Sequence, residues 1–300
     1  MKAIKWFGIV IGSVLGLLLI AAFGLYAKAR SDITRRYVIS AEGFSAPNDA
    51  ASVLRGEHLV SVICIECHGE DLGGTPAWID LGPLGAMDTP NLTTGEGGLG
   101  KELSDADIVR ILRHGVKPDG TSVFVMPAPD FHYLSDEDMG DIIAYVRTVP
   151  PVDRQTGGHL TFLGNVMYGA GAFGELLSAA KIDHDNPPSA SPEPGVNADY
   201  GAYLVRINSC RDCHGKELAG GRSAEPGAPL APNLTPGGEL RAWSREQSIQ
   251  TLRTGVTPSG TSMQYMPWEF KGQMTDDELT AIWGYLTSLQ PMETSTAVSK

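Results

Sequence analysis

Two short cysteine motifs hold the residues of this sequence that are best suited to chemistry. The chain has four cysteines, and a histidine directly follows each close pair: Cys64 and Cys67 before His68, and Cys210 and Cys213 before His214. Two thiols three residues apart lie on one helical turn, beside the imidazole that follows them. This spacing is the attachment signature of c-type haem, in which the thiols bond the vinyl groups and the histidine binds the iron. The sequence therefore predicts two covalently bound haem c groups.

A zinc site is the alternative interpretation of paired Cys-x-x-Cys motifs. Zinc-binding pairs usually lie within a few tens of residues of each other, whereas residues 68–209, a stretch of 142, separate the two pairs here. Each pair also lies in its own copy of a sequence repeat, which disfavours both a shared zinc site and a redox-active dithiol. Haem is therefore the favoured cofactor.

The chain contains two copies of one sequence pattern. Residues 115–145 match residues 255–285 at a constant offset of 140, and both segments contain Gly-Val, Gly-Thr-Ser and Met-Pro. A Pro-Asn-Leu-Thr segment begins at Pro90 and recurs at Pro232, an offset of 142, and the cysteine motifs recur at an offset of 146. Because the order is the same in both copies, we infer a duplicated domain of roughly 100 residues, a size that folds alone.

Met126 and Met266 are the candidates for the second axial ligand of each iron. Of the nine methionines, they alone occupy equivalent positions in the two copies, each before a proline in a loop between expected helices. A methionine opposite a histidine raises the reduction potential of the iron and closes it to substrates. We expect the histidines outside the two motifs to be solvated, with His132, six residues past Met126, as the rival ligand.

The Pro-Asn-Leu-Thr segments begin 22 and 18 residues past the motif histidines. A histidine that binds a metal usually donates its other N–H group to a carbonyl or carboxylate, which fixes the orientation of the ring. Pro90 and Pro232 are candidates to supply that carbonyl oxygen. A simple turn at each segment is the alternative.

Helical patterns dominate both copies, and no segment alternates convincingly with the period of a strand. Ser104 and Ser244 are expected to begin one helix in each copy, while Ser135 and Thr275 begin the last one. Each has a polar partner three residues later, as in a capping box. The first helix of each copy runs into its cysteine motif. We therefore predict an all-α fold.

The segment from Trp6 to Tyr26 is 21 residues long and has no charged side chain. A run of this length crosses the roughly 30 Å hydrocarbon core of a bilayer, and aromatic residues at both ends suit its two interfaces. Lysines and arginines flank the run on both sides, so charge alone does not give its orientation. We predict a single-pass anchor, and a signal peptide cleaved after Ala29 is the alternative.

The region between the two copies has two parts. Residues 160–182 are apolar and Gly-rich, and the residues that follow are rich in Pro, Ser and Asn, which is typical of a linker. We expect the apolar part to pack between the two domains, with the membrane surface as the alternative. The expected divisions of the chain are a transmembrane anchor (1–30), a juxtamembrane linker (31–48), a first domain (49–151), a connector (152–198), a second domain (199–292) and a tail (293–300).

The charge balance limits the choice of partners. The formal net charge is −12, and no basic patch with interleaved aromatic residues appears, so nucleic acid is excluded as a partner. An acidic surface would instead steer a positively charged redox partner toward the chain, in a salt-dependent way.

The sequence resembles the class I cytochromes c in their dihaem, membrane-anchored bacterial form. The resemblance covers residues 49–151 and 199–291 and is carried by the cysteine motifs, the Pro-Asn-Leu loops and the Met-Pro pairs. It implies two tandem cytochrome c domains in which the carbonyls of Pro90 and Pro232 accept from the motif histidines. It also implies contacts between a glycine of the first helix and an aromatic residue of the last: Gly56 with Tyr145, and Gly201 with Tyr285.

The same resemblance implies electron transfer between a redox-protein donor and acceptor, not catalysis by the chain itself. The chain would serve as a tethered carrier, or as the cytochrome subunit of a respiratory, photosynthetic or dehydrogenase complex. Since c-type haem is attached outside the cytoplasm, the haem domains would lie on the periplasmic side of a bacterial cytoplasmic membrane. The alternative is a dihaem peroxidase-type enzyme, which needs one iron with an open or displaceable ligand.

Overall fold

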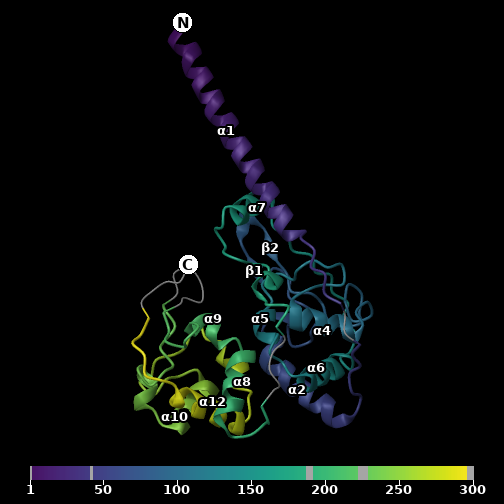
Figure 1. Ribbon diagram of the computed structural model, residues 1–300, viewed down its shortest axis with the longest axis vertical. Helices are drawn as coiled ribbons and strands as arrows, with labels where there is room; N and C mark the ends of the chain where they lie inside the picture. The colour runs from purple at the N-terminus through teal and green to yellow at the C-terminus, as the bar shows by residue number, and fades with distance from the viewer. Residues whose placement is uncertain (1, 41–42, 187–191, 222–228, 296–300) are drawn as a thin grey trace.

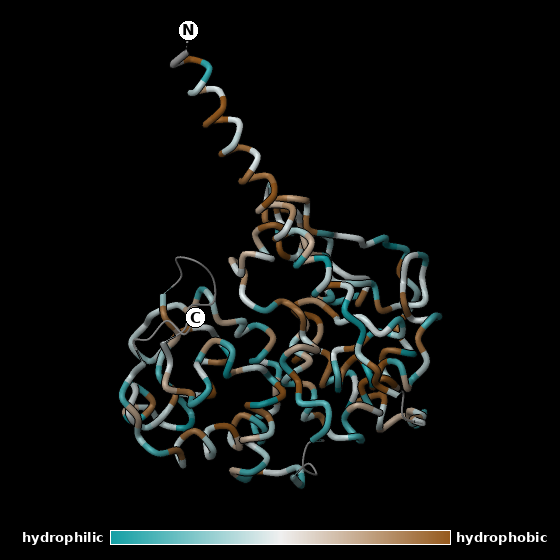
Figure 2. The backbone as a smooth tube through the Cα atoms, turned by 45° about the horizontal axis from the view of Figure 1, so that its top comes forward, coloured by the Kyte–Doolittle hydropathy of each residue, from teal (hydrophilic) through white to brown (hydrophobic). Residues whose placement is uncertain are grey.

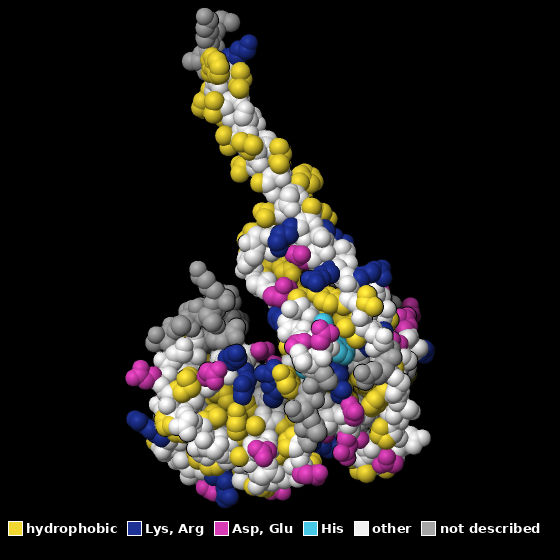
Figure 3. Space-filling view, in the orientation of Figure 1, with side chains coloured by type: hydrophobic (Ala, Val, Ile, Leu, Met, Phe, Trp, Pro, Cys, Tyr) yellow, Lys and Arg dark blue, Asp and Glu magenta, His cyan; other side chains and the backbone are white. Residues whose placement is uncertain are grey.

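One long helix stands clear of a folded body made of two lobes (Figure 1). The computed structural model describes residues 2–40, 43–186, 192–221 and 229–295. The long helix α1, Lys2–Ile33, is hydrophobic along most of its length (Figure 2), and its apolar side chains are exposed (Figure 3). Within the described residues, its segment Ile4–Ile33 is the one helix long and apolar enough to cross a membrane. No part of its most apolar window is buried in the protein, so the surface of α1 is suited to lipid.

The lobe next to α1 is formed by the first repeat. It is built of short helices and long loops, with one antiparallel ribbon of two-residue strands in which Ile79 pairs with Met87. In chain order its elements are α2 (Ala50–Ile63), α3 (Ile65–His68), β1 (Ile79–Asp80), η1 (Gly82–Leu84), β2 (Ala86–Met87), α4 (Asp105–His114), α5 (Ala128–Phe131) and α6 (Asp136–Val146).

The second repeat forms the other lobe with the same order of major helices. The sheet β1–β2 of the first lobe is the one sheet in the described part of the chain, so the prediction of an all-α fold is confirmed. In chain order the elements of the second lobe are α8 (Ala198–Ile207), α9 (Cys210–His214), η3 (Glu239–Ala242), α10 (Arg245–Thr254), α11 (Trp268–Lys271) and α12 (Asp276–Ser288).

Side-chain caps begin the helices that the sequence pattern predicted. Full capping boxes begin α4, α10 and α12, because the capping hydroxyl accepts from a backbone N–H three residues on and that residue's side chain accepts in return. At α6, Ser135 accepts from the Asp138 N–H. The predicted starts of these helices are therefore confirmed: Ser104, Ser135, Ser244 and Thr275.

Two glycines let the first and last helices of each repeat cross at close range. A Cβ atom on Gly56 of α2 would lie 1.9 Å from the Asp141 carbonyl oxygen of α6, and one on Gly201 of α8 would lie 2.0 Å from the Ala281 carbonyl oxygen of α12. No side chain fits at such distances, so each crossing requires glycine. The aromatic residues expected at these crossings have Cβ atoms 2.9 Å from the same positions: Tyr145 and Tyr285.

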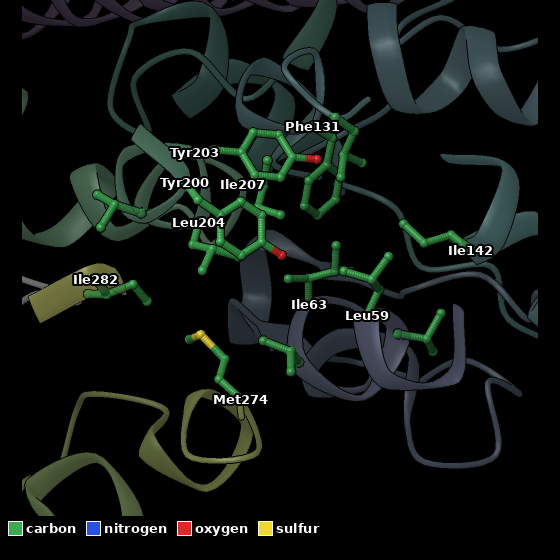
Figure 4. Packing of buried hydrophobic residues seen from close by; sticks show 14 of the residues in the cluster. Leu59, Ile63, Phe131, Ile142, Tyr200, Tyr203, Leu204, Ile207, Met274 and Ile282 are labelled. Carbon is green, nitrogen blue, oxygen red and sulfur yellow. The ribbon is translucent and has the colours of Figure 1, made fainter. Parts of the chain in front are cut away.

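The two repeats share one hydrophobic core. Helices α2, α5 and α6 of the first lobe meet α8 and α12 of the second, and Figure 4 shows Ile63 and Phe131 close to Tyr203 and Ile207. The Tyr203 hydroxyl donates to the buried Asp138 carboxylate of α6 at 2.5 Å. Because apolar and polar contacts both cross the boundary, the lobes form one packed body.

The apolar connector packs beneath α1 and against the first repeat. It forms α7 (Phe162–Gly169) and η2 (Ser178–Lys181), and Figure 1 shows α7 beside the base of α1. Its Tyr168 and Leu177 join Ala29 of α1 in a small second core. The expectation that this stretch packs between the two domains is therefore wrong. Its apolar residues pack on α1 and the first lobe. Gly169 has no side chain, so α7 can come into close contact with α1.

Candidate haem sites

Each cysteine motif forms a single helical turn at the end of a longer helix. Cys64 is the C-cap of α2, and its carbonyl oxygen accepts from the Cys67 N–H at 3.2 Å and the His68 N–H at 3.0 Å. In the second repeat, α9 begins at Cys210 and ends at His214. A glycine at positive φ ends each turn, at Gly69 and Gly215. The turn therefore holds both thiols and the imidazole of each motif together, as haem attachment requires.

The imidazole of each motif is oriented by a proline carbonyl. His68 Nδ1 lies 3.0 Å from the Pro90 carbonyl oxygen, and His214 Nδ1 lies 2.9 Å from that of Pro232. A carbonyl oxygen only accepts, so Nδ1 carries the hydrogen in both rings. The lone pair is then on Nε2, the atom left to bind a metal. Burial lowers the pKa of both histidines, with the proline hydrogen bond acting the other way, so the neutral, ligating form predominates at pH 7.

The four cysteines are partly buried, and the neutral thiol is favoured at Cys64, Cys67 and Cys210. Burial raises the pKa of Cys64 and of Cys67 to about 12, and that of Cys210 to about 11. Zinc needs thiolates in one cluster, and no group of three or more His, Cys, Asp or Glu side chains suited to a metal occurs in the described residues. The donor set fits thioether attachment and disfavours zinc.

The loop that carries each proline is locked by residues to which the sequence analysis gave no role. The Asn91 side chain, fully buried, donates to the Val152 carbonyl oxygen at 2.7 Å and accepts from the Thr93 backbone and hydroxyl. Asn233 and Thr235 repeat the arrangement in the second lobe, where Asn233 donates to the Met292 carbonyl oxygen at 2.8 Å. The recurrence of Asn and Thr after the proline was the signal that could have identified them.

A glycine packs against the backbone of each proline loop. A Cβ atom on Gly74 would lie 2.7 Å from the Pro90 carbonyl carbon, and one on Gly220 would lie 2.8 Å from that of Pro232. Both glycines have positive φ, at 80° and 75°. Their N–H groups donate to the carbonyl oxygens of His68 and His214 at 2.9 and 2.8 Å. Each glycine thus ties the histidine backbone to the loop that orients its ring.

The candidate axial methionines occupy one position in both repeats. Met126 and Met266 are half-buried, and the prolines that follow them are the N-caps of the one-turn helices α5 and α11. Met126 packs against the shared core, and Ser178 of the connector donates to its carbonyl oxygen at 2.6 Å. The loops therefore present a thioether from matching places in the two lobes.

The rival ligand His132 belongs to a cluster of histidines. Its Nδ1 donates to the Arg113 carbonyl oxygen at 2.8 Å, and its ring lies 6.1 Å from that of His114. His114 Nδ1 in turn lies 3.1 Å from His184 Nδ1. His132 is only 5% exposed, and His58 contacts the Glu278 carboxylate at 2.7 Å. The expectation of solvated histidines is wrong for His132, which is buried. His58, His114 and His184 are partly buried, and His159 is exposed as expected.

A buried lysine lies between the two cysteine motifs. Lys271 of α11 is 9% exposed, donates to the Val62 carbonyl oxygen at 2.9 Å, and lies 3.8 Å from the Glu66 carboxylate. Its positive charge acts on Cys64 and on Cys210, where it opposes the rise in thiol pKa that burial causes. The charge of one ammonium group thus acts on the attachment sites of both lobes.

Comparison with known proteins agrees with this geometry. The model of the family described as cytochrome c oxidase, cbb3-type, subunit III matches residues 51–146 and 196–286, once in each repeat and over more than half of the chain. The chain belongs to this family. As a member of this cytochrome c family, it carries covalently bound haem c and transfers electrons.

The relatives of this family member include cytochrome subunits of dehydrogenases. It is 28% identical over 270 residues to the fructose dehydrogenase cytochrome subunit of Gluconobacter japonicus, covering 79% of this chain and 52% of that one. It is 29% identical over 287 residues to the gluconate 2-dehydrogenase cytochrome c subunit of Pantoea cypripedii, covering 84% and 62%. The chain thus spans about half to three fifths of the length of these relatives.

A third relative is of similar length. The diheme cytochrome c-type protein of Cereibacter sphaeroides is 27% identical over 308 aligned positions, which cover 93% of this chain and 97% of that one. All three relatives are named as cytochromes or cytochrome subunits. They support an electron carrier that is not itself a catalytic enzyme, and they give no support to the peroxidase alternative.

Proposed function

We propose that this chain is the dihaem electron-transfer subunit of a membrane-bound dehydrogenase. The observation that carries the proposal is the duplicated histidine–proline carbonyl pair, which leaves Nε2 of His68 and of His214 available to a metal. The relatives named as cytochrome subunits of dehydrogenases support the assignment to such a complex.

The proposed sites use one set of side chains in each lobe. The thiols of each motif would attach the haem covalently, and the motif histidine and the methionine of the same lobe would hold its iron. When bound, haem c supplies an iron that accepts and releases one electron, and His/Met ligation gives it a high reduction potential. The proposed sets are Cys64, Cys67, His68 and Met126 for the first haem, and Cys210, Cys213, His214 and Met266 for the second.

Residues next to these ligands hold them in place during electron transfer. The carbonyls of Pro90 and Pro232 fix the imidazole rings, while Asn91 and Asn233 hold the proline loops. A fixed ligand set limits the rearrangement that accompanies a change in iron charge.

The proposed topology places both lobes on the periplasmic side of a bacterial cytoplasmic membrane, because c-type haem is attached outside the cytoplasm. The donor is then a dehydrogenase held at the membrane, and the acceptor is the next redox protein. The net charge of −12 favours acceptors with a basic docking surface.

A free tethered carrier is the second candidate. The similar length of the Cereibacter sphaeroides diheme cytochrome favours it, since the chain aligns with 97% of that protein. In this case the same haem sites would shuttle electrons between partners that bind only briefly.

Purification from native membranes in mild detergent separates the two candidates. Mass spectrometry of the proteins that accompany the tagged chain is expected to find a dehydrogenase in stoichiometric amount. Recovery of the chain alone, still anchored and still red, would contradict the subunit assignment and favour the carrier. Haem content, measured on the same sample, tests the two proposed sites independently of the partner.

A further inference from the structure

Helix α7 is fixed against the part of α1 that leaves the membrane. The Phe162 ring stacks on that of Tyr26, with centroids 5.0 Å apart, and meets Phe23 edge-on at 5.6 Å. A Cβ atom on Gly169 would lie 2.1 Å from the Leu25 carbonyl oxygen, so the two helix backbones are in direct contact. The height of α7 relative to the bilayer is therefore set by the height of residues 23–26 of α1.

Charged residues of α1 mark the point at which this helix leaves the bilayer. Lys28 is the first charged residue after the apolar run, and its ammonium pairs with the Asp32 carboxylate at 2.9 Å. The side chains of this pair are 61% and 42% exposed. The bilayer interface thus falls near Tyr26, where aromatic residues favour it, and Phe162 lies at the same level.

The outward face of α7 is apolar, contrary to the usual pattern of a helix on a water-exposed surface. Phe162 and Leu163 are each 49% exposed and Met167 is 36% exposed. The opposite face is the buried one, with Asn165 and Tyr168. No charged side chain occurs in residues 160–174, so this face has no charged group to present to water.

We propose that Phe162, Leu163 and Met167, the lipid face of α7, lie in the interfacial layer of the same phospholipid bilayer that α1 crosses. The apolar face then continues the lipid-exposed surface of α1 instead of standing in water. Exposed basic residues at the base of α1, among them Lys28, Arg30 and Arg35, suit the headgroups of anionic lipids. Figure 3 shows basic side chains gathered at this level. The first lobe is thereby held against the membrane by two elements.

Photolabelling in proteoliposomes tests this proposal on the full chain. The holoprotein is reconstituted alone with a phospholipid whose acyl chain carries a diazirine, irradiated, digested and analysed by mass spectrometry. We expect the α7 peptide to be labelled within about threefold of the α1 peptide. Exposed apolar residues of the second lobe, Val256 and Tyr265 at 40% and 42% exposure, serve as an internal control and are expected to be labelled at least tenfold less.

Two variants sharpen the test. Leu163→Glu combined with Met167→Glu, at exposed positions that leave the buried face of α7 unchanged, is expected to lower α7 labelling at least fivefold. The matched control Val256→Glu is expected to leave it unchanged. Labelling of α7 at the level of the Val256 peptide, in protein whose α1 is labelled and whose haem spectrum is normal, would overturn the proposal. A double variant with unchanged α7 labelling would overturn it as well.

Discussion

Lys271 of the second repeat donates from its ammonium group to the carbonyl oxygen of Val62 in the first repeat, at a distance of 2.9 Å. Val62 lies two residues before Cys64, so a cation of one lobe is buried at the attachment site of the other. The equivalent position in the first repeat, 140 residues earlier, is Phe131. The first repeat therefore has no counterpart of this contact or of the positive charge that the contact buries.

We expect Lys271→Met to lower the reduction potentials of the haems in both lobes. A nearby positive charge favours the reduced iron, and its loss at an effective dielectric constant of about 20 changes the reduction equilibrium by about tenfold or less, ~30–60 mV per haem. A spectroelectrochemical titration measures both potentials. Lys271→Arg keeps the charge and should keep the potentials, as should Lys101→Met at an exposed site. Unchanged potentials in Lys271→Met would refute the assigned role.

Met266→Ala is expected to remove one axial ligand from the haem of the second lobe. The iron should become high-spin, or bind a foreign ligand, and its reduction potential should fall because the thioether no longer stabilises the ferrous form. Optical and EPR spectra of the purified variant report this change. Met263→Ala is the matched control, since Met263 lies in the same loop without a counterpart in the first repeat. A Met266→Ala spectrum identical to that of the parent protein would exclude this ligand.

Gly201→Ala should destabilise the second lobe by about 2–3 kcal/mol or more, because the added Cβ would overlap the Ala281 carbonyl oxygen. Thermal unfolding followed by circular dichroism measures the loss. Gly284→Ala, in α12 with no atom within 4 Å of the new Cβ, is the control. It is expected to be neutral or to stabilise by up to about 1 kcal/mol, since alanine favours helix. Equal effects of the two variants would contradict the close helix crossing.

The interface between the lobes is expected to weaken in acid. Glu278 contacts Arg55 at 3.0 Å and His58 at 2.7 Å. Burial acts to raise its pKa, but the hydrogen bonds from His58 and the Thr275 backbone prevail and lower it to about 2. A carboxyl group with a depressed pKa stabilises the fold above its unfolded-state pKa of about 4.5, and this contribution is lost as the pH falls toward 2.

Glu278→Gln tests this dependence. At pH 7 the variant should be less stable by about 2 kcal/mol, because Arg55 loses the nearer of its two carboxylate partners, Glu278 and Asp138. The difference in the free energy of unfolding should shrink between pH 4.5 and pH 2. Denaturant titrations across this range measure it, with Asp277→Asn, an exposed neighbour, as the control. A difference that is independent of pH would contradict the assigned ion pair.

Local signals in the sequence were sufficient for the fold class and the haem motifs. The cysteine spacing, the caps at Ser104 and Thr275 and the repeat offset each depend on residues close together in the chain. The packing of the two lobes depends on contacts such as Arg55 with Glu278, 223 residues apart. The repeated pattern indicated Glu278 only as the capping partner of Thr275, and no periodicity or spacing indicated that it meets Arg55.

The packing of the connector, residues 152–198, could not be predicted from the sequence either. Its apolar composition indicated burial, but not against which surface. The decisive feature is Gly169, which allows the backbone of α7 to approach Leu25. A glycine in a Gly-rich stretch gives no sign of such a partner in the sequence.

We propose that one chain carries two haems and passes electrons one at a time through each. The most direct test is a coulometric redox titration of the purified full chain, which counts electrons taken up per polypeptide. We expect two electrons in two one-electron steps, each with the absorbance change of low-spin c-type haem. One electron per chain, or a step that transfers two electrons together, would contradict it.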